Sequence, residues 1–227
     1  MKKQLVTLDI NNYNPEITKW TLPTIKHYAH KIGAELKVIT EPVFKQPGFV
    51  TYEKFQIYEL AKGYDWTIFL DIDTLVYPDT PDFSEGVTKD IVLFHGLDVS
   101  LNRFRPTNYT RRSGILAGAC TWNVWCSDWT RDIWHPMQET TFDECISNIF
   151  PTIPEIKSGC CDAKHLIDDY LVTQNITRYG LKTQTILDIC KGWGCNSGFF
   201  HLYATATHEK EFKIPEKVRE WGLDIGR

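Results

Sequence analysis

Two aspartates separated by one residue, Asp71 and Asp73, follow a short apolar run in this chain of 227 residues. The run, residues 66–70, has the length and the residue types of a buried strand. On an extended segment, residues two apart point the same way, so both carboxylates can face one ion. Two carboxylates held this close repel each other unless a cation lies between them. The motif therefore predicts a divalent metal site, and its hard oxygen ligands suit Mg²⁺ or Mn²⁺.

The segments before this motif predict the elements that would position it. Residues 4–10 and 35–40 are typical of strands, and residues 15–32 of a helix with Pro15 in its first turn. Thr51 is the expected N-cap of a second helix that runs to Lys62. Alternating strands and helices predict an α/β fold with a parallel, doubly wound sheet and helices on both faces. Ligands bind beyond the carboxyl ends of such strands, where the two aspartates fall.

The second half of the chain continues this alternation. No repeat, low-complexity tract or linker interrupts it, so residues 1–227 are expected to form a single domain, which could be one domain of a larger protein. The expected strands are residues 90–94, 114–119 and 182–189; the expected helices are residues 162–179 and a segment capped by Thr121 that carries Trp122, Trp125 and Trp129 on one stripe.

Composition and charge exclude several classes of protein. The formal net charge of -4 argues against a nucleic-acid binder, which would show a basic face. No run of 18 apolar residues predicts a transmembrane helix, and the first residues lack the apolar core of a signal peptide. We therefore expect a cytoplasmic protein. The 7 cysteines lack a zinc-ligand spacing and are expected to be free thiols, many of them buried.

The segment around the aspartates resembles a known family. Residues 51–58 (TYEKFQIY) and 64–76 (YDWTIFLDIDTLV) are similar to nucleotide-sugar glycosyltransferases of the GT-A fold, a Rossmann-like and mostly parallel sheet. The pattern is most similar to those of glycosyltransferase family 8 and of small virus-encoded relatives. The similarity covers most of the chain, from the first strand to the segment near His208. It implies a metal-dependent hexosyl- or deoxyhexosyltransferase. The expected donor is a nucleotide-diphosphate sugar, with UDP as the expected nucleotide, and the expected acceptor is a hydroxyl of a glycan or glycoconjugate.

The resemblance also implies roles for single residues. Asp71 and Asp73 would bind Mn²⁺ or Mg²⁺, which holds the donor diphosphate and neutralises it as the leaving group. His201 would be the third ligand. His208 competes with it, because the Gly and the Lys-Pro-Trp ending of the family pattern are missing. Asp169, preferred to Asp168, would be the reacting carboxylate, as a general base in an inverting enzyme or facing the sugar in a retaining one.

A third group of residues is expected to hold the donor. The first strand and its loop match the segment that binds the nucleoside in this family, where Thr7 could read the uracil edge and Tyr13 could stack on it. Four arginines (Arg103, Arg105, Arg111 and Arg112) could contribute a diphosphate or acceptor contact, and residues 114–118 resemble the strand that lines the donor sugar. The donor-binding residues implied are Thr7, Leu8, Asp9, Tyr13, Lys54, Asp71, Ile72, Asp73 and Lys210.

Most of these residues also have a plainer interpretation. A lone histidine is more often structural, Lys54 could lie on a helix surface, Asp9 could cap a turn, and Asp168 and Asp169 could be a solvated pair. A haloacid-dehalogenase-type phosphatase also ends a strand in Asp-x-Asp, but it has Thr four residues after the first Asp, where this chain has Leu75. A non-catalytic nucleotide-sugar-binding protein is the other alternative, and retaining all three carboxylates argues against it.

Overall fold

A computed structural model of the chain describes residues 1–46, 49–95, 121–138, 141–149, 151, 167–202 and 205–223. The predicted strand 114–119, the four loop arginines and the start of the predicted helix 162–179 lie outside these residues. The strands are β1 (Lys3–Leu8), β2 (Ala34–Ile39), β3 (Trp66–Leu70), β4 (Leu75–Val76), β5 (Ile91–Phe94), β6 (Asn123–Ser127), β7 (Lys182–Thr185) and β8 (Phe199–Phe200).

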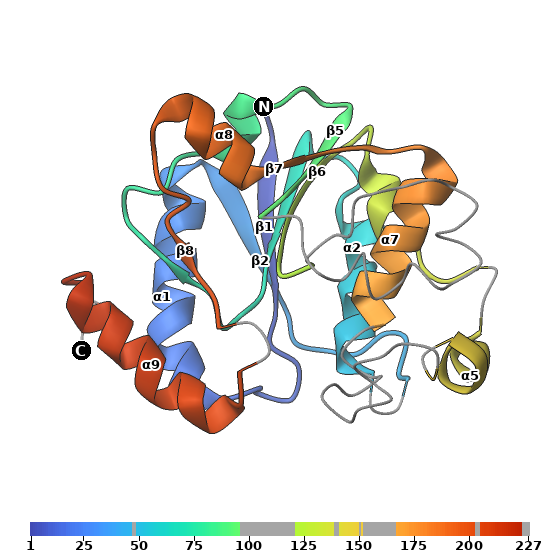
Figure 1. Cartoon of the computed structure of the whole chain (residues 1–227), viewed down its shortest axis with the longest axis horizontal. Coiled ribbons are helices and arrows are strands. Elements are labelled where there is room, and N and C mark those ends of the chain that lie inside the picture. The colour runs from blue at the N-terminus through green and yellow to red at the C-terminus, as the bar shows by residue number, and fades with distance from the viewer. Residues whose placement is uncertain are drawn as a thin grey trace.

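The helices complete the described elements. The longest are α1 and α9, and both lie on the same side of the sheet in Figure 1. The α-helices are α1 (Pro15–Lys31), α2 (Ile57–Leu60), α5 (Phe142–Glu144), α7 (Ile167–Tyr179), α8 (Ile186–Trp193) and α9 (Thr207–Glu220). Short 3₁₀ turns are η1 (Val50–Gln56), η2 (Phe83–Gly86) and η3 (Arg131–Trp134), and a π-turn, η4 (Cys145–Ile149), follows α5.

The central sheet has six strands in the order β2-β1-β3-β6-β5-β7. The pairs β1–β2, β1–β3 and β5–β7 are parallel, whereas β6 is antiparallel to both of its neighbours. Figure 1 shows α1 and α8 on one face of this sheet and α2 and α7 on the other. The predicted α/β fold, with a mostly parallel sheet between helices, is therefore confirmed.

Strand residues alternate between two hydrophobic cores because side chains of a strand point to opposite faces. Val6 and Phe69 pack with residues of α2 and α7, while Leu5 and Ile68 pack with residues of α1 and α8. Burial on both faces explains why β1 and β3 are buried at every position and do not alternate between buried and exposed residues.

Two predicted elements were wrong in type, the second of them only beyond Thr185. The segment after Thr121 is strand β6 and not a helix, and Trp129 is exposed while Trp125 is buried. All five residues of β6 are buried, and a short, fully buried apolar run does not distinguish a strand from a helix. The predicted strand 182–189 ends at Thr185, whose hydroxyl accepts a hydrogen bond from the backbone N–H of Asp188 and so starts α8.

The predicted helix from Thr51 to Lys62 also differs in the structure. It begins as the 3₁₀ turn η1 at Val50 and is α-helical only over Ile57–Leu60. Thr51 is not its N-cap, and no side chain caps the turn. Lys54 is drawn inward from this turn and is buried, which a regular surface helix would not require.

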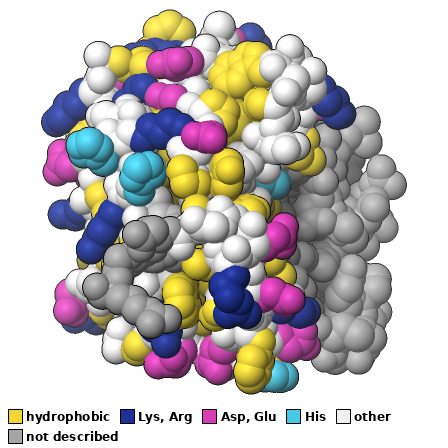
Figure 2. Space-filling model, turned by 90° about the vertical axis from the view of Figure 1, so that its left-hand side faces the viewer, with side chains coloured by type: hydrophobic (Ala, Val, Ile, Leu, Met, Phe, Trp, Pro, Cys, Tyr) yellow, Lys and Arg dark blue, Asp and Glu magenta, His cyan; other side chains and the backbone are white. Residues whose placement is uncertain are grey.

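The surface agrees with the modest net charge. Figure 2 shows basic and acidic side chains interspersed with hydrophobic ones over the face that carries α1 and α9. None of the helices in the described ranges is both long enough and apolar enough to cross a membrane.

Candidate functional site

The two aspartates lie directly beyond the carboxyl end of β3, as the sequence predicted. The backbone N–H of Asp71 donates to the carbonyl of Trp122 at 2.8 Å, and the N–H of Thr74 donates back to the carbonyl of Asp71 at 3.0 Å. This turn fixes the backbone between the carboxylates. Ile72 points into the hydrophobic core between them, and Asp73 is buried. The close carboxylates of the motif are thus held by a tight turn and a buried anchor.

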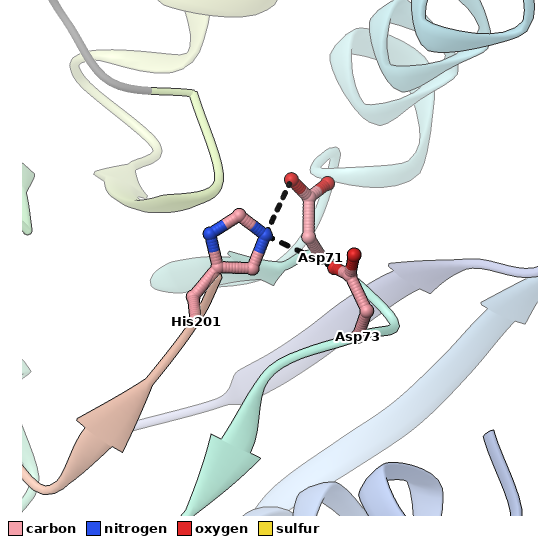
Figure 3. A group of neighbouring side chains, drawn as sticks. All are labelled: Asp71, Asp73 and His201. Carbon is pink, nitrogen blue, oxygen red and sulfur yellow. Dashed lines mark hydrogen bonds and ion pairs between the residues drawn. The ribbon is translucent and has the colours of Figure 1, made fainter. Parts of the chain in front are cut away.

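A two-stranded ladder brings His201 to this turn. β4 follows the aspartates and pairs antiparallel with β8, so that Leu75 faces Phe200 and the next residue, His201, reaches Asp73. The imidazole Nε2 lies 3.0 Å from Asp73 Oδ1 and 3.9 Å from Asp71 Oδ2. Figure 3 shows Nε2 directed at both carboxylates. One ligand atom from each of the three residues lies within 4.8 Å of the others.

The structure distinguishes the two candidate histidines by position. His208 is exposed in the first turn of α9, whereas His201 is the histidine that meets the aspartates. The ring of His201 also stacks on Trp122, with centroids 4.7 Å apart and planes at 16°. This stacking fixes the ring and leaves Nε2 aimed at the carboxylates (Figure 3).

Two buried lysines flank the aspartates. Lys54 Nζ lies 3.0 Å from Asp71 Oδ1 and 2.7 Å from Asp168 Oδ2, and Lys210 Nζ lies 2.6 Å from Asp73 Oδ2. Burial alone would lower the pKa of Lys54, but the charges of Asp168 and Asp71 outweigh it and raise that pKa. Lys54 is therefore not a surface lysine. Its ammonium group bridges the carboxylates of Asp71 and Asp168.

The carboxyl groups of Asp71 and Asp73 differ in their pKa. Burial opposes ionisation of Asp73, yet His201 and Lys210 outweigh it and hold the pKa of Asp73 below its usual range. The pKa of Asp71 is raised by burial and by the charge of Asp73, although Lys54 is near. Lys54 and Lys210 therefore do not fully compensate the negative charge of Asp71 and Asp73. Two carboxylates and an imidazole nitrogen converging on one point fit a divalent cation, which would supply that balance.

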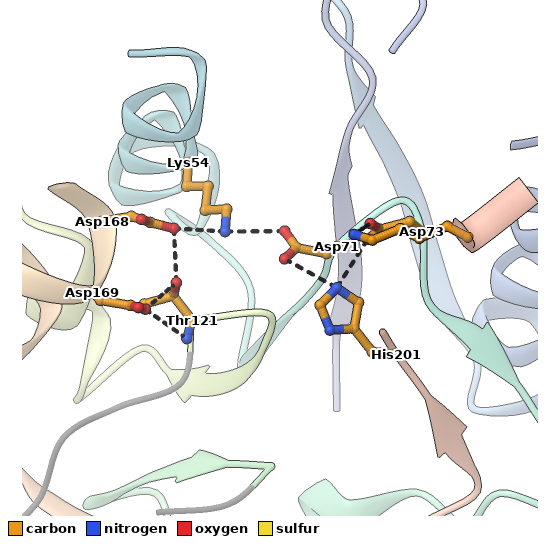
Figure 4. Close-up of polar contacts among 8 residues, drawn as sticks. Lys54, Asp71, Asp73, Thr121, Asp168, Asp169 and His201 are labelled. Atoms are coloured by element: carbon orange, nitrogen blue, oxygen red, sulfur yellow. Dashed lines mark hydrogen bonds and ion pairs between the residues drawn. The ribbon is translucent and has the colours of Figure 1, made fainter. Parts of the chain in front are cut away.

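Asp168 and Asp169 lie in the first turn of α7, and both are buried. Thr121 connects them, because its Oγ1 lies 2.7 Å from Asp168 Oδ2 and 2.7 Å from Asp169 Oδ1 (Figure 4). One hydroxyl has one proton and donates to only one of these oxygens. The second contact is favourable when the other carboxyl carries its own proton.

The proton belongs on Asp169. Burial, reinforced by the charge of Asp168, raises the pKa of Asp169 to about 7. Asp168 instead forms an ion pair with Lys54, whose Nζ lies 2.7 Å from Asp168 Oδ2. Below neutral pH the polar chain therefore runs from the carboxyl of Asp169 through the hydroxyl of Thr121 to the carboxylate of Asp168. Through Lys54 it continues to Asp71 (Figure 4).

The residues of the first strand and its loop that were expected to bind the donor differ in how far they are accessible. Thr7 is fully buried and its hydroxyl has no hydrogen-bond partner within the described ranges, while Leu8 is also buried. Asp9 accepts a hydrogen bond from the N–H of Tyr13 at 2.9 Å and so shapes the following loop. Tyr13 is 44% exposed, and its pKa is raised by partial burial and by the nearby charge of Asp73. Tyr13 is thus the residue of this segment that presents a ring beside the aspartates.

Sequence reasoning missed two residues that organise this site. Thr121 was expected to cap a helix and Trp122 to pack on one, but they join the acidic pair and support His201. No local pattern could have shown this, because Thr121 and Asp169 are 48 positions apart in the chain. The small residues and aromatics around them are equally compatible with a helix.

Removing Lys54 should destabilise the folded protein, because Lys54 compensates the charges of two carboxylates. We expect Lys54→Met to lower the free energy of unfolding by about 3–5 kcal/mol, because it leaves the buried carboxylate of Asp168 and the partly buried carboxylate of Asp71 without their shared cation. Urea unfolding followed by circular dichroism measures this change. Lys62→Met is the matched control, since Lys62 pairs with Glu59 on the surface and should change stability little. Equal effects of both substitutions would contradict the bridging role.

Comparison with known proteins supports the fold. No protein-family model matches the sequence, and no curated protein matches it. The structure resembles a glycosyltransferase involved in glycosylation of the major capsid of PBCV-1, with a TM-score of 0.50 and 13% identity over 94% of this chain and 99% of that chain. The chain therefore has the GT-A fold.

Two other solved structures are similar at lower scores. A mutant of Drosophila β-1,4-galactosyltransferase 7, in complex with manganese, UDP-Gal and xylobiose, has a TM-score of 0.48 and 11% identity over 92% of this chain and 74% of that one. The galactosyltransferase LgtC, in complex with donor and acceptor sugar analogues, has a TM-score of 0.45 and 12% identity over 96% of this chain and 99% of that one.

Proposed function

We propose that this protein is a metal-dependent glycosyltransferase that moves a sugar from a nucleotide-diphosphate sugar to an acceptor hydroxyl. The observation that carries the proposal is the convergence of Asp71, Asp73 and His201 beyond the carboxyl end of β3, within a GT-A fold. Ligands of open α/β sheets bind at that edge. The expected donor is a UDP-sugar, and the expected acceptor is a glycan or glycoconjugate, as the sequence resemblance implies.

The metal would be held by the two carboxylates and Nε2 of His201. An imidazole beside carboxylates suits Mn²⁺ better than Mg²⁺, which prefers an octahedral shell of oxygens. When bound, the cation would act as a Lewis acid on the diphosphate leaving group. Lys54 orients the Asp71 carboxylate toward the cluster, and Lys210 does the same for Asp73. The ring of Tyr13 lies beside this cluster and is available to stack on the nucleobase.

Asp169 is the proposed reacting carboxylate. A general base works best when its pKa is near the working pH, and burial raises the pKa of Asp169 to about 7. The N–H and hydroxyl of Thr121 both contact Asp169 Oδ1, at 3.2 and 2.7 Å, and orient it. Asp168, paired with Lys54, would accept the hydrogen bond of the Thr121 hydroxyl and so keep the orientation of that hydroxyl fixed.

A donor screen tests this function directly. The protein is mixed with Mn²⁺ and single nucleotide-sugars, and its melting temperature is recorded. A bound donor should raise the melting temperature, because a ligand that binds only the folded state stabilises it. Chelation by EDTA should remove the shift, and slow release of the nucleoside diphosphate should accompany binding.

Turnover assays and phosphoenzyme trapping, added to this screen, separate the alternatives. Binding without turnover or hydrolysis, with any acceptor, would favour a non-catalytic nucleotide-sugar-binding protein. Phosphate-ester hydrolysis with a phosphoenzyme trapped at Asp71 would instead indicate the phosphatase. That second outcome is not expected, because Leu75 occupies the threonine position of the phosphatase motif and is buried in β4.

The histidine assignment gives a sharper prediction. We expect His201→Ala to weaken Mn²⁺ binding by about tenfold or more, because it removes one of three protein ligands. His208→Ala should leave the affinity unchanged, since His208 is exposed on α9. Isothermal titration with Mn²⁺ and a fixed donor concentration compares the two variants. Weaker binding by the His208 variant alone would reverse the assignment.

A further inference from the structure

The end of helix α8 is closed by a specific backbone motif. Gly194 has a left-handed conformation, with φ of 65°, and its N–H donates to the carbonyl of Cys190. The N–H of Cys195 donates to the same carbonyl at 3.1 Å. The second bond spans six residues, as in a Schellman motif, in which a left-handed glycine turns the chain back over the last helical turn.

In this motif the side chains of the two residues joined by the longer bond commonly contact each other. Here both positions are cysteines. Cys190 is 6% exposed and packs with Ile186 and Ile189, while Cys195 is partly buried against the same cluster. Burial raises the pKa of Cys190 to about 12, and a hydrogen-bond contact with the thiol of Cys195 adds to that rise. The six-residue backbone bond and the shared hydrophobic cluster therefore place the two thiols at the same helix end.

We propose that Cys190 and Cys195 are a site of reversible disulfide formation. The described cysteines are all free thiols in the structure, and this pair is held together by the helix end. Folding has thus already constrained the two backbones that a disulfide must join, so that oxidation requires little further ordering. This proposal does not depend on the glycosyltransferase activity.

The reaction is a thiol–disulfide exchange with a small disulfide such as oxidised glutathione. Cys195, the more accessible thiol, loses its proton and attacks one glutathione sulfur, which releases one reduced glutathione and leaves a mixed disulfide. Cys190 then loses its proton and attacks the sulfur of Cys195, which releases the second glutathione. Two protein thiols are oxidised to one disulfide, and one oxidised glutathione is reduced to two thiols.

The link would brace the segment that leads to the proposed metal site. Cys195 is followed by β8, which pairs with β4 and ends directly before His201. Trp193, at the end of α8, also stacks on Phe83 with ring planes at 8°. The disulfide would thus fix the start of residues 195–200. The stacking of Trp193 on Phe83 holds the chain before this segment, and the pairing of β8 with β4 holds its other end.

Peptide mapping tests the link. The intact protein is equilibrated in glutathione buffers of increasing oxidised fraction, quenched with iodoacetamide and digested with trypsin. Cleavage after Lys191 separates residues 183–191 from residues 192–210, so that an intact disulfide yields a joined pair about 2 Da lighter than its two thiol peptides. We expect this joined pair in the folded protein, and also in a Cys145→Ser variant. Cys195→Ser should remove it.

Two glycine variants test whether the motif creates the site. Gly194→Ala should lower the equilibrium constant for disulfide formation by about tenfold, because Ala is strained in the left-handed region and the reduced helix end can fray to relieve it. Gly192→Ala is the control and should leave the constant unchanged, since Gly192 lacks a positive φ and a Cβ there meets open space. Separate alkylation of both thiols at every buffer ratio, or linkage of Cys195 to another cysteine, would overturn the proposal.

Discussion

Asp73→Ala is expected to abolish metal-dependent donor binding, with a loss of affinity of at least about 100-fold, or roughly 3 kcal/mol. Asp73 contributes one of two carboxylates to the cluster, and its oxygens are within 3.0 Å of His201 Nε2 and 2.6 Å of Lys210 Nζ. Its removal would leave the ammonium of Lys210 without its carboxylate partner, and that uncompensated positive charge would repel a cation. Asp71→Ala should have a similar effect, although Lys54 would keep Asp168 as a partner.

Titration calorimetry with Mn²⁺ and a UDP-sugar measures this loss. Asp79→Ala is the matched control, because Asp79 is an exposed aspartate shortly after the motif and should leave donor affinity unchanged. Circular dichroism establishes that both variants are folded. Wild-type affinity in folded Asp73→Ala and Asp71→Ala proteins would refute the metal site and, with it, the proposed function.

Asp169→Asn should reduce the rate of sugar transfer by about 10²- to 10⁴-fold while leaving donor affinity unchanged. Asparagine keeps the shape of the side chain, and its Oδ1 can still accept the hydrogen bond from the Thr121 N–H, but it cannot take a proton from the acceptor. Asp169 also lies outside the group of Asp71, Asp73 and His201. Transfer near the wild-type rate would exclude Asp169 as the base and leave Asp168 as the remaining candidate of the pair.

The pH dependence follows from the raised pKa of Asp169. A base acts when deprotonated, so wild-type transfer should increase as the pH rises through about 7. Stability should change in the opposite direction. Between the usual pKa of an aspartate and about 7, the unfolded chain has lost a proton that the folded protein retains, so the free energy of unfolding falls as pH rises.

This linkage provides a second readout for the same substitution. Asp169→Asn removes the ionisation, and its free energy of unfolding at pH 8 should therefore exceed that of the wild type. If Asp169 is a catalytic carboxylate that is destabilised by burial, the variant should be slower in transfer but more stable than the wild type. A slower and less stable variant would indicate a structural role. Urea unfolding at pH 5 and pH 8 distinguishes the two outcomes.

Local sequence was informative where neighbouring residues decide the structure. Residues 66–70 and the aspartates that follow predicted a buried strand and its carboxyl end correctly, because apolar burial and the two-residue spacing act within one segment. Asn14 and Pro15 likewise predicted the start of α1, where the Asn14 side chain accepts a hydrogen bond from the N–H of Glu16. The helix predicted from the spacing of Trp122, Trp125 and Trp129 was wrong, because every residue of β6 is buried and a short buried run is compatible with either a helix or a strand.

The sequence by itself therefore determined the α/β class, the strand that ends in Asp71 and Asp73, and a short set of candidate partners. Only the tertiary structure decided which partners meet them. The pairing of β4 with β8 selects His201, the irregular turn η1 turns Lys54 inward, and Thr121 joins two carboxyl groups. Each of these contacts joins segments that are distant in the chain, so their geometry depends on packing and sheet order rather than on any local spacing of residues.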